Sequence, residues 1–341
     1  MVTAELPTYE SLKFRVGDGE YTHVYEVRLS RPSHRNAFHE TLWLEFYSCI
    51  KFLDNLPSCR CIIITADGPV FSAGIDLAFA ATLLHSPVNF VKKCTHHAQD
   101  SGRTGGKEDT RNRKFSAALV QLGSTANEVD MEGEGSKEED CARKAFHLQR
   151  GVSKMQDTFT SLEECSKPVI VCVTGACVGA AVDLICACDI RLASQDAWFT
   201  VKEVDLGIAA DLGTLQRLPR VVGNDSWVRD VCFTGRIFHA AEAKKVGFLS
   251  DVFKSKEILF QHAWTLATTI ATKSPVAVLG TKVALNYATR RSVSEELKLQ
   301  SIWNSAMLQT VDIPLALSIQ ARQKQQEHGR SPTRGHTFSN L

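Results

Sequence analysis

Residues 168–188 read PVIVCVTGACVGAAVDLICAC, and this stretch decides the fold. The continuous apolar run from Val169 to Val173 predicts a buried strand, and the run from Ala180 to Cys188 predicts a helix. The stretch is apolar enough to raise the question of a membrane helix, but its glycines and Asp183 divide it into a strand, a turn and a helix. We therefore interpret it as a buried strand–turn–helix unit.

The same alternation occurs nearer the N-terminus. Apolar and polar residues alternate from Tyr25 to Leu29, as in a half-buried strand. Apolar residues at helical spacing predict a helix from about Glu40 to Asp54, and the β-branched run from Cys61 to Thr65 predicts the next strand. Strands that alternate with helices in this way imply stacked layers, so we expect an α/β fold.

The bulk composition is that of an ordinary globular protein. The chain has 341 residues, of which 44% are hydrophobic and 23% charged, and its formal net charge is +1. A nearly neutral chain gives no electrostatic reason to expect nucleic acid or an anionic membrane as the main partner. The segment from Met1 to Phe14 lacks a long apolar or arginine-rich stretch, so we expect neither a secretory signal nor a typical mitochondrial transit peptide.

The eleven cysteines do not follow a metal-binding or redox pattern. One residue separates Cys59 from Cys61 and Cys186 from Cys188, whereas metal knuckles and redox motifs need a gap of two. We therefore expect free, mostly buried thiols in a reducing compartment, and no metal site.

Two regions depart from the α/β pattern. Residues from about 98 to 143 are polar and charged, so we expect a largely mobile surface insertion, with a partner-binding role left open. After Ser255 the pattern becomes helical, and we divide the chain into a core, 1–255, and a helical region, 256–341, that packs on the core or on a neighbouring subunit. The predicted helical stretches are 258–270, 275–287 and 295–325.

Two segments of small residues are candidates for binding an anion. The first, Phe71 to Leu77, lets its backbone N–H groups approach an oxyanion closely. In the second, small residues lead from a strand into the helix that begins near Ala180, and a helix N-terminus is a natural anion site. Asp183 lies in the first turn of that helix, where complementing the helix dipole would be an ordinary structural role.

A third segment, Phe199 to Gly213, holds two carboxylates. Glu203 and Asp211 bracket a loop of small and apolar residues, where poor solvation raises the pKa of a carboxyl group toward working pH. We expect them to act as general acid and base. Asp211 could also be the N-cap of a helix through Leu215 and Leu218, a role compatible with catalysis.

Together these segments resemble the crotonase, or enoyl-CoA hydratase/isomerase, superfamily, and within it most of all the dienoyl-CoA isomerases. The resemblance covers nearly the whole chain except the insertion, and it implies a crotonase-like spiral of ββα repeats with a C-terminal helical region. The motifs that carry it are Val182-Asp183-Leu184, Ala187-Cys188-Asp189-Ile190-Arg191, Val201-Lys202-Glu203-Val204-Asp205, Gly213-Thr214-Leu215-Gln216-Arg217-Leu218-Pro219, Phe233-Thr234-Gly235-Arg236, Ala241-Glu242-Ala243 and Lys273-Ser274-Pro275-Val276-Ala277-Val278.

The resemblance also implies a role for each site residue. The N–H groups of Ile75 and Ala180 would form the oxyanion hole. Glu203 would act near C2 of the acyl chain, Asp211 would reach toward C6, and Asp183 would be a third carboxylate in the same pocket. The implied substrate-binding residues are Ala73, Gly74, Ile75, Asp76, Leu77 and Ala180.

The implied reaction converts 3,5-dienoyl-CoA to 2,4-dienoyl-CoA in fatty-acid β-oxidation. It needs no metal, flavin or nicotinamide, and coenzyme A enters as part of the substrate. The family usually has three glycines where this chain has Gly179-Ala180-Ala181, which keeps the N–H donors but adds two methyl groups. The family also implies a homo-oligomer, either a trimer or a hexamer.

The last three residues, Ser339-Asn340-Leu341, are a relative of the Ser-Lys-Leu peroxisomal address. They predict a peroxisome or peroxisome-like organelle and a peroxisomal import receptor as a partner. A mitochondrial location is the alternative.

Three other functions stay open on the sequence alone. A 2-enoyl-CoA hydratase needs two glutamates that face one water, whereas here Asp183 stands in the place of the first glutamate and Asp211 is surplus. A non-catalytic acyl-CoA-binding homologue is suggested by Ala180-Ala181 and by the insertion. An RNA-binding homologue would need a lysine-rich helix, and the pairs Lys92-Lys93 and Lys244-Lys245 are too few.

Overall fold

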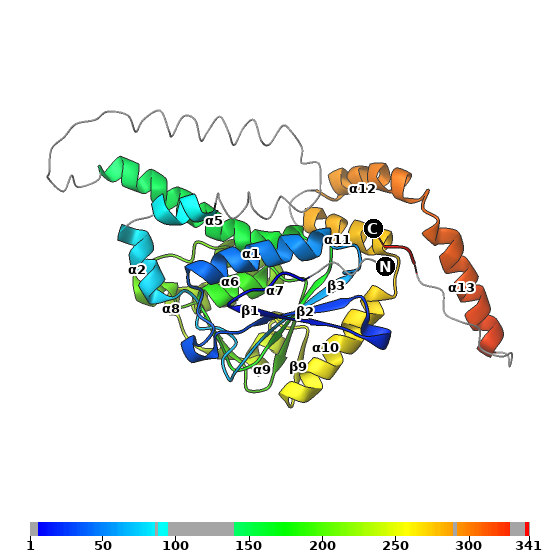
Figure 1. Cartoon of the computed structure of the whole chain (residues 1–341), viewed down its shortest axis with the longest axis horizontal. Helices are drawn as coiled ribbons and strands as arrows, with labels where there is room; N and C mark the ends of the chain where they lie inside the picture. The colour runs from blue at the N-terminus through cyan, green and yellow to red at the C-terminus, as the bar shows by residue number, and fades with distance from the viewer. Residues whose placement is uncertain (1–5, 86–87, 95–139, 289–291, 328–337, 341) are drawn as a thin grey trace.

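A six-stranded sheet forms the centre of the molecule (Figure 1). The computed structural model describes residues 6–85, 88–94, 140–288, 292–327 and 338–340. In spatial order the strands are β1 (Leu12–Val16), β2 (Val24–Leu29), β3 (Cys61–Ala66), β4 (Val169–Val173), β6 (Ile190–Ser194) and β9 (Asp251–Phe253). Strand β1 runs antiparallel to β2, and every later pair is parallel. The predicted strands in β2, β3 and β4 are confirmed, but β2, expected to be half-buried, is buried almost throughout.

Helices cover both faces of this sheet, which explains why its parallel strands are apolar almost throughout. Helix α10 (Lys256–Ala271) packs on one face through Leu259, Ala263 and Ala267, while α1 (Glu40–Asn55) and α5 (Cys141–Glu164) lie on the other (Figure 1). The predicted α/β class is therefore confirmed.

A second, three-stranded sheet positions the loops of the candidate site. It consists of β5 (Ala176–Val178), β7 (Trp198–Thr200) and β8 (Phe238–His239). The N–H of Val178 donates to the carbonyl of Ser72 at 3.1 Å, so the segment around residue 72 is attached to β5. Helix α6 (Ala180–Cys186) begins directly after β5, which confirms residues 168–188 as a strand, a turn and a helix.

The remaining helices of the core surround this smaller sheet. They are α2 (Leu77–His85), α7 (Thr214–Val222), α8 (Asp225–Thr234) and α9 (Ala240–Lys245), with short 3₁₀ turns η1 (Gly19–Tyr21), η2 (Pro32–His34) and η3 (Glu203–Leu206). None of the helices in the described part of the chain is long and apolar enough to span a membrane. All eleven cysteines are free and most are buried, as predicted.

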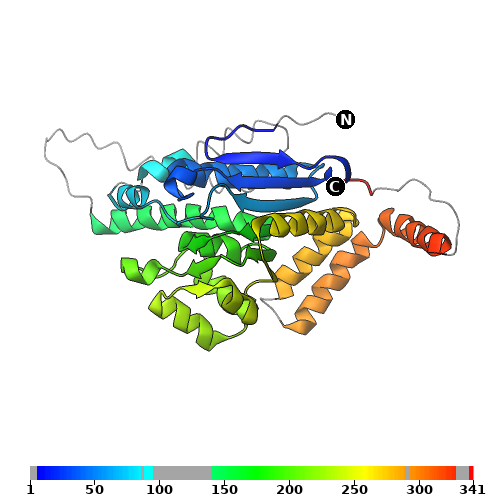
Figure 2. The ribbon, with the colours of Figure 1, turned by 90° about the horizontal axis from the view of Figure 1, so that it is seen from below.

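After α10, the C-terminal region continues as three further helices, and Figure 2 shows α12 beside α11 and α13 extending away from the core. They are α11 (Pro275–Ala288), α12 (Val293–Met307) and α13 (Asp312–Glu327). The stretch predicted at 295–325 thus divides in two, because Pro314 is compatible with the first turn of a new helix but not with a helix interior. Exposed apolar side chains on and between α12 and α13 are Val293, Leu297, Ile302, Leu308, Val311 and Leu317.

The predicted insertion at 98–143 lies mostly outside the described residues. Its last residues differ from the prediction, because α5 begins at Cys141 and is capped by the side chain of Asp140, which accepts a hydrogen bond from the N–H of Ala142 at 3.2 Å. The following residues have the helical apolar spacing that packs α5 on α1.

Candidate active site

A cavity of about 420 Å³ opens between the segment after residue 71, the start of α6 and the loop that follows η3. Glu203 and Asp211 both line it, as do Ile75 and Ala180, which were predicted from segments far apart in sequence. Of the other predicted substrate-binding residues, Ala73, Asp76 and Leu77 line the cavity and Gly74 lies behind it. Asp183 does not line the cavity, because it is buried one layer deeper.

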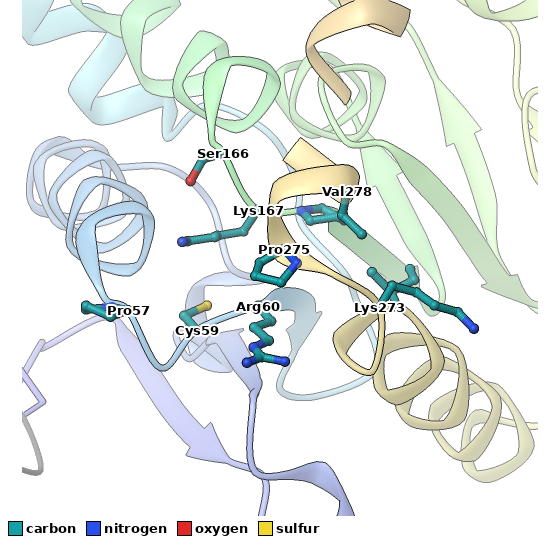
Figure 3. A pocket seen from close by; sticks show the side chains of 10 residues that line it. Pro57, Cys59, Arg60, Ser166, Lys167, Lys273, Pro275 and Val278 are labelled. Carbon is teal, nitrogen blue, oxygen red and sulfur yellow. The ribbon is translucent and has the colours of Figure 1, made fainter. Parts of the chain in front are cut away.

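A second hollow lies beside Arg60, Lys167 and Pro275 (Figure 3), and none of the residues that line it also lines the cavity of Glu203 and Asp211. Its volume is about 10 Å³, which is room for about one water molecule. It is therefore too small for a substrate. A third cavity, of about 440 Å³ beside His39 and Phe79, is lined by neither Glu203 nor Asp211, so the cavity that these two carboxylates line is the candidate active site.

The backbone around Ile75 leaves its N–H available to a ligand. Phe38 pairs in parallel with Ile75, and this pairing uses the carbonyl of Gly74 (2.7 Å) and the N–H of Asp76 (3.0 Å), so the Ile75 N–H stands outside it. Gly74 has a φ of +85°, and a Cβ there would lie 2.5 Å from the carbonyl oxygen of Val178. Only glycine therefore lets this loop approach the end of β5 so closely.

Ala180 is the candidate for the second N–H, and its nitrogen would lie 3.3 Å from a Cβ on Gly74, beside the Ile75 segment. It is the first residue of α6, and the N–H at this position has no acceptor within its own helix. The helix dipole favours negative charge at this end. Ala180 and Ala181 are both buried and in helical conformation, so the two methyl groups that replace the family's glycines are accommodated without a break in the helix.

Asp183 fixes the end of the loop that carries Asp211. Its Oδ1 atom accepts the N–H of Thr214, the first residue of α7, at 2.5 Å. The prediction that Asp211 is the N-cap of this helix is wrong: Gly213 occupies that position, and Asp183 of α6 satisfies the N–H instead. Asp183 therefore complements the dipole of the neighbouring helix α7.

Glu203 lies in η3 with its side chain turned toward the start of α6. Its Oε1 atom is 3.2 Å from the place that a Cβ on Gly179 would occupy. Within the described ranges, neither the Oε2 of Glu203 nor the Oδ2 of Asp183 has a hydrogen-bond partner, although both atoms are buried. Buried polar atoms are normally paired, so these two oxygens mark a place where a ligand or a transferred proton is expected.

All three carboxyl groups have raised pKa values, and burial is the main cause in each. Burial, reinforced by the charge of Glu203, raises the pKa of Asp183 to about 7. Burial and the charge of Asp211 raise the pKa of Glu203, and partial burial raises that of Asp211 at the outer side of the cavity. Neighbouring carboxyl groups of this kind can hold a proton on one member and accept one on another near neutral pH.

Sequence reasoning missed two residues that fix the loop bearing Asp211. Gln156 of α5 donates its Nε2–H to the carbonyl of Asp211 at 2.6 Å. Arg217 donates through Nη1 to the carbonyl of Leu212 at 3.4 Å. Arg217 was visible as part of a family motif, but Gln156 gave no signal because its partner is distant in sequence.

The sequence model of the enoyl-CoA hydratase/isomerase family matches residues 19–97 and 134–326, which is more than half of the chain. The chain belongs to this family. The resemblance predicted from the sequence motifs is thereby confirmed.

Within the enoyl-CoA hydratase/isomerase family, the chain is similar over most of its length to relatives that are named for one activity. The chain is 39% identical over 320 residues to the mitochondrial Delta(3,5)-Delta(2,4)-dienoyl-CoA isomerase of Homo sapiens, covering 94% of this chain and 81% of that protein. It is 36% identical over 297 residues to the peroxisomal Delta(3,5)-Delta(2,4)-dienoyl-CoA isomerase of Arabidopsis thaliana, covering 87% and 89%.

Solved structures of the family confirm the crotonase-like fold. An enoyl-CoA hydratase from Bacillus anthracis superimposes with a TM-score of 0.69 at 21% identity, covering 97% of this chain and 99% of that one. A putative enoyl-CoA hydratase from Thermobifida fusca, in complex with acetoacetyl-CoA, gives a TM-score of 0.62 at 24% identity, covering 87% and 94%.

Proposed function

We propose that this protein is a delta(3,5)-delta(2,4)-dienoyl-CoA isomerase that acts in fatty-acid β-oxidation. The observation that carries this function is the pairing of Glu203 and Asp211, two carboxyl groups of raised pKa that line one cavity beside the N–H groups of Ile75 and Ala180. Relatives named for this activity are 36–39% identical to the chain over most of its length.

The mechanism follows from the chemistry of a thioester. A proton on C2 becomes removable when the developing enolate oxygen is stabilised, which the N–H groups of Ile75 and Ala180 would do. Glu203 takes the C2 proton to give a conjugated dienolate, and Asp211 delivers a proton to C6, so both double bonds move by one position. The proton lost at C2 is balanced by the proton gained at C6. Because this is redox-neutral proton transfer, we expect no cofactor beyond the coenzyme A of the substrate.

Asp183 assists this pair rather than touching the substrate. One of its oxygens caps α7, and the residue lies below the cavity, where burial and the charge of Glu203 raise its pKa to about 7. This arrangement disfavours the 2-enoyl-CoA hydratase alternative, since a hydratase needs two carboxylates that face one water. A non-catalytic acyl-CoA-binding role is also less favoured, because both candidate N–H donors and both cavity carboxylates are in place.

A diene-isomerisation assay on a 3,5-dienoyl-CoA tests the function. We expect turnover by the wild type and losses of several orders of magnitude in Glu203→Gln and in Asp211→Asn. Asp205→Asn is the matched control, because Asp205 is an exposed carboxylate of the same segment that does not line the cavity. Near-normal activity in both site variants, or faster hydration of crotonyl-CoA than isomerisation of the diene, would overturn the assignment.

We further propose a homo-oligomer, a trimer or a hexamer, assembled through α12 and α13. The exposed apolar side chains of these helices, such as Leu297 and Leu317, support an interface in this region. Light scattering coupled to size exclusion would measure the assembly, and a monomer at micromolar concentration would contradict it.

For the location we propose a peroxisome or peroxisome-like organelle, with the mitochondrion as the alternative, since relatives of both locations are named. An import receptor would bind Ser339-Asn340-Leu341, of which Leu341 lies outside the described residues. Arg60 donates to the carbonyl of Phe338 and, at 3.0 Å, to the side chain of Asn340, so a receptor must displace these contacts. Imaging of a fluorescent fusion with and without the tripeptide would test the signal.

A further inference from the structure

The loop that carries Asp211 is anchored at three of the four residues from Asp211 to Thr214. The carbonyls of Asp211 and Leu212 accept hydrogen bonds from Gln156 and Arg217. The N–H of Thr214 donates to Asp183. Between these contacts lies Gly213, where a Cβ would lie 1.9 Å from Nη1 of Arg217 and would displace the guanidinium. The anchor therefore holds the backbone of the loop and leaves the carboxylate of Asp211 facing the cavity.

Arg217 joins this loop to one face of helix α5. Its Nε donates to Glu163 at 2.8 Å and its Nη2 to the hydroxyl of Thr160 at 3.1 Å. The side chains of Arg217 and Glu163 are 15% and 19% exposed, so solvent and salt screen this ion pair less than one at the surface. Gln156, Thr160 and Glu163 are spaced by four and three residues, which places all three on the same stripe of α5.

Glu203 is held in a different way, and none of these anchoring contacts involves it. It belongs to η3, and its carboxylate lies against the start of α6 at Gly179. The carboxylate near C2 thus lies against α6, whereas the loop of the group that reaches C6 is held by Gln156 of α5 and by Arg217 in addition to Asp183 of α6.

We propose that Arg217 is a positioning residue that, together with Gln156 and Glu163 of α5, sets the reach of Asp211 for delivery of the proton at C6. This inference rests on the proposed isomerase function. Loss of the anchor leaves removal of the C2 proton by Glu203 intact and impairs the second half of the reaction. A displacement of a catalytic group by about 1 Å costs on the order of 100-fold in rate, which sets the scale of the effect.

The test compares two rates on the same 3,5-dienoyl-CoA in deuterated water: incorporation of deuterium at C2, and formation of the 2,4-diene. In Arg217→Gln we expect isomerisation to fall by on the order of 10- to 100-fold while C2 exchange stays within about threefold of wild type. Arg217→Lys should recover part of the loss. Gln156→Ala should change the ratio of the two rates in the same direction, and because Gln156 is exposed, this variant preserves the fold.

Gln149→Ala is the matched control, an exposed glutamine on α5 that is seven residues from Gln156 and has no part in the anchor. Equal losses of both rates in Arg217→Gln and Gln156→Ala, or an unchanged ratio in both, would overturn the inference. Amide hydrogen exchange at residues 211–214 gives a readout independent of activity and should be faster in both variants than in Gln149→Ala. If the wild type did not isomerise the diene, the proposed function would be refuted. The amide exchange would still show whether Arg217 and Gln156 anchor the loop.

Discussion

Two aspartates at opposite ends of helix α6 have opposite environments. Asp183, in the first turn, is 1% exposed, and its Oδ2 atom has no partner among the described residues. Asp189, just beyond the last turn, accepts the N–H of Val169 and the Nζ–H of Lys282, each at 2.7 Å. The same residue type, six positions apart, keeps one carboxylate oxygen without a partner at one end of the helix and has charged and backbone donors at the other.

The two aspartates therefore contribute to different properties, Asp183 to the candidate site and Asp189 to the stability of the fold. Lys282 is buried and also donates to the carbonyls of Leu162 and Lys167, so the group around Asp189 joins α11 to the core with its donors satisfied. Around Asp183 and Glu203, burial without full pairing lowers stability and raises the pKa of both carboxyl groups, that of Asp183 to about 7. Substitutions around Glu203 should therefore change turnover, and substitutions around Asp189 should change the free energy of unfolding.

The largest effect is expected on the cavity side, in Glu203→Gln. Loss of a general base costs on the order of 100- to 10,000-fold in rate. The melting temperature should stay the same or rise, because the amide removes a buried ionisable group. Turnover and thermal unfolding of the same preparation measure both quantities. If Glu203→Gln lost activity only in proportion to its loss of folded protein, its effect would be one of stability, and the two sides of α6 would not differ as we expect.

On the opposite side, Lys282→Met should destabilise the fold and spare the chemistry. Removing the cation leaves Asp189 partly buried without its charged partner, and breaking such a pair costs on the order of 3 kcal/mol in the free energy of unfolding. Denaturant unfolding measures this cost, and kcat per folded enzyme should not change. Lys273→Met, at an exposed lysine before α11, is the control and should be close to neutral. A neutral Lys282→Met would show that Asp189 does not depend on this partner.

The sequence predicted the strands and the cavity residues, and failed on contacts between distant segments. Residues 169–173 are predictable because a buried parallel strand is apolar on both faces. Glu203 and Asp211 are predictable because they bracket one loop and match a family motif. The capping of α7 by Asp183 is not, since the nearest local candidate was Asp211, whereas the side chain that accepts the Thr214 N–H lies 31 residues away in sequence. Local propensity carries no information about such a tertiary contact.

The same limit explains the other differences. Residues 295–325 have continuous helical spacing, yet a break falls before Pro314, where a local backbone restriction prevails over periodicity. The pairing of Gln156 with the loop at Asp211 depends on how α5 lies across α7, which no short-range pattern encodes.

The pH dependence of stability sharpens the comparison at Asp183. Its pKa rises from 3.8 to about 7 on folding, so between about pH 4 and pH 7 the unfolded chain loses this proton before the folded chain does. Rising pH therefore favours unfolding across this window, by at most a few kcal/mol. Asp183→Asn, which cannot ionise, should match the wild type near pH 4 and be more stable than it at pH 7.5. Urea unfolding at both pH values tests this, with Asp205→Asn as the control. A constant difference between variant and wild type at the two pH values would show that Asp183 titrates normally.

The smallest effect is expected at the N-terminus of α6, in Ala180→Gly. This change restores the residue usual in the family and keeps the N–H donor, so the rate should change by less than about tenfold, far below the loss of 100-fold or more that follows removal of such a donor. Stability should fall by about 0.5–1 kcal/mol at most, because glycine is less favourable than alanine in a helix. Ala181→Gly is the matched control, since Ala181 is fully buried and does not line the cavity. A large gain in kcat for Ala180→Gly, without one for Ala181→Gly, would mean that the Ala180 methyl group obstructs the thioester. The N-terminus of α6 would then bind the substrate less well than a glycine at this position allows.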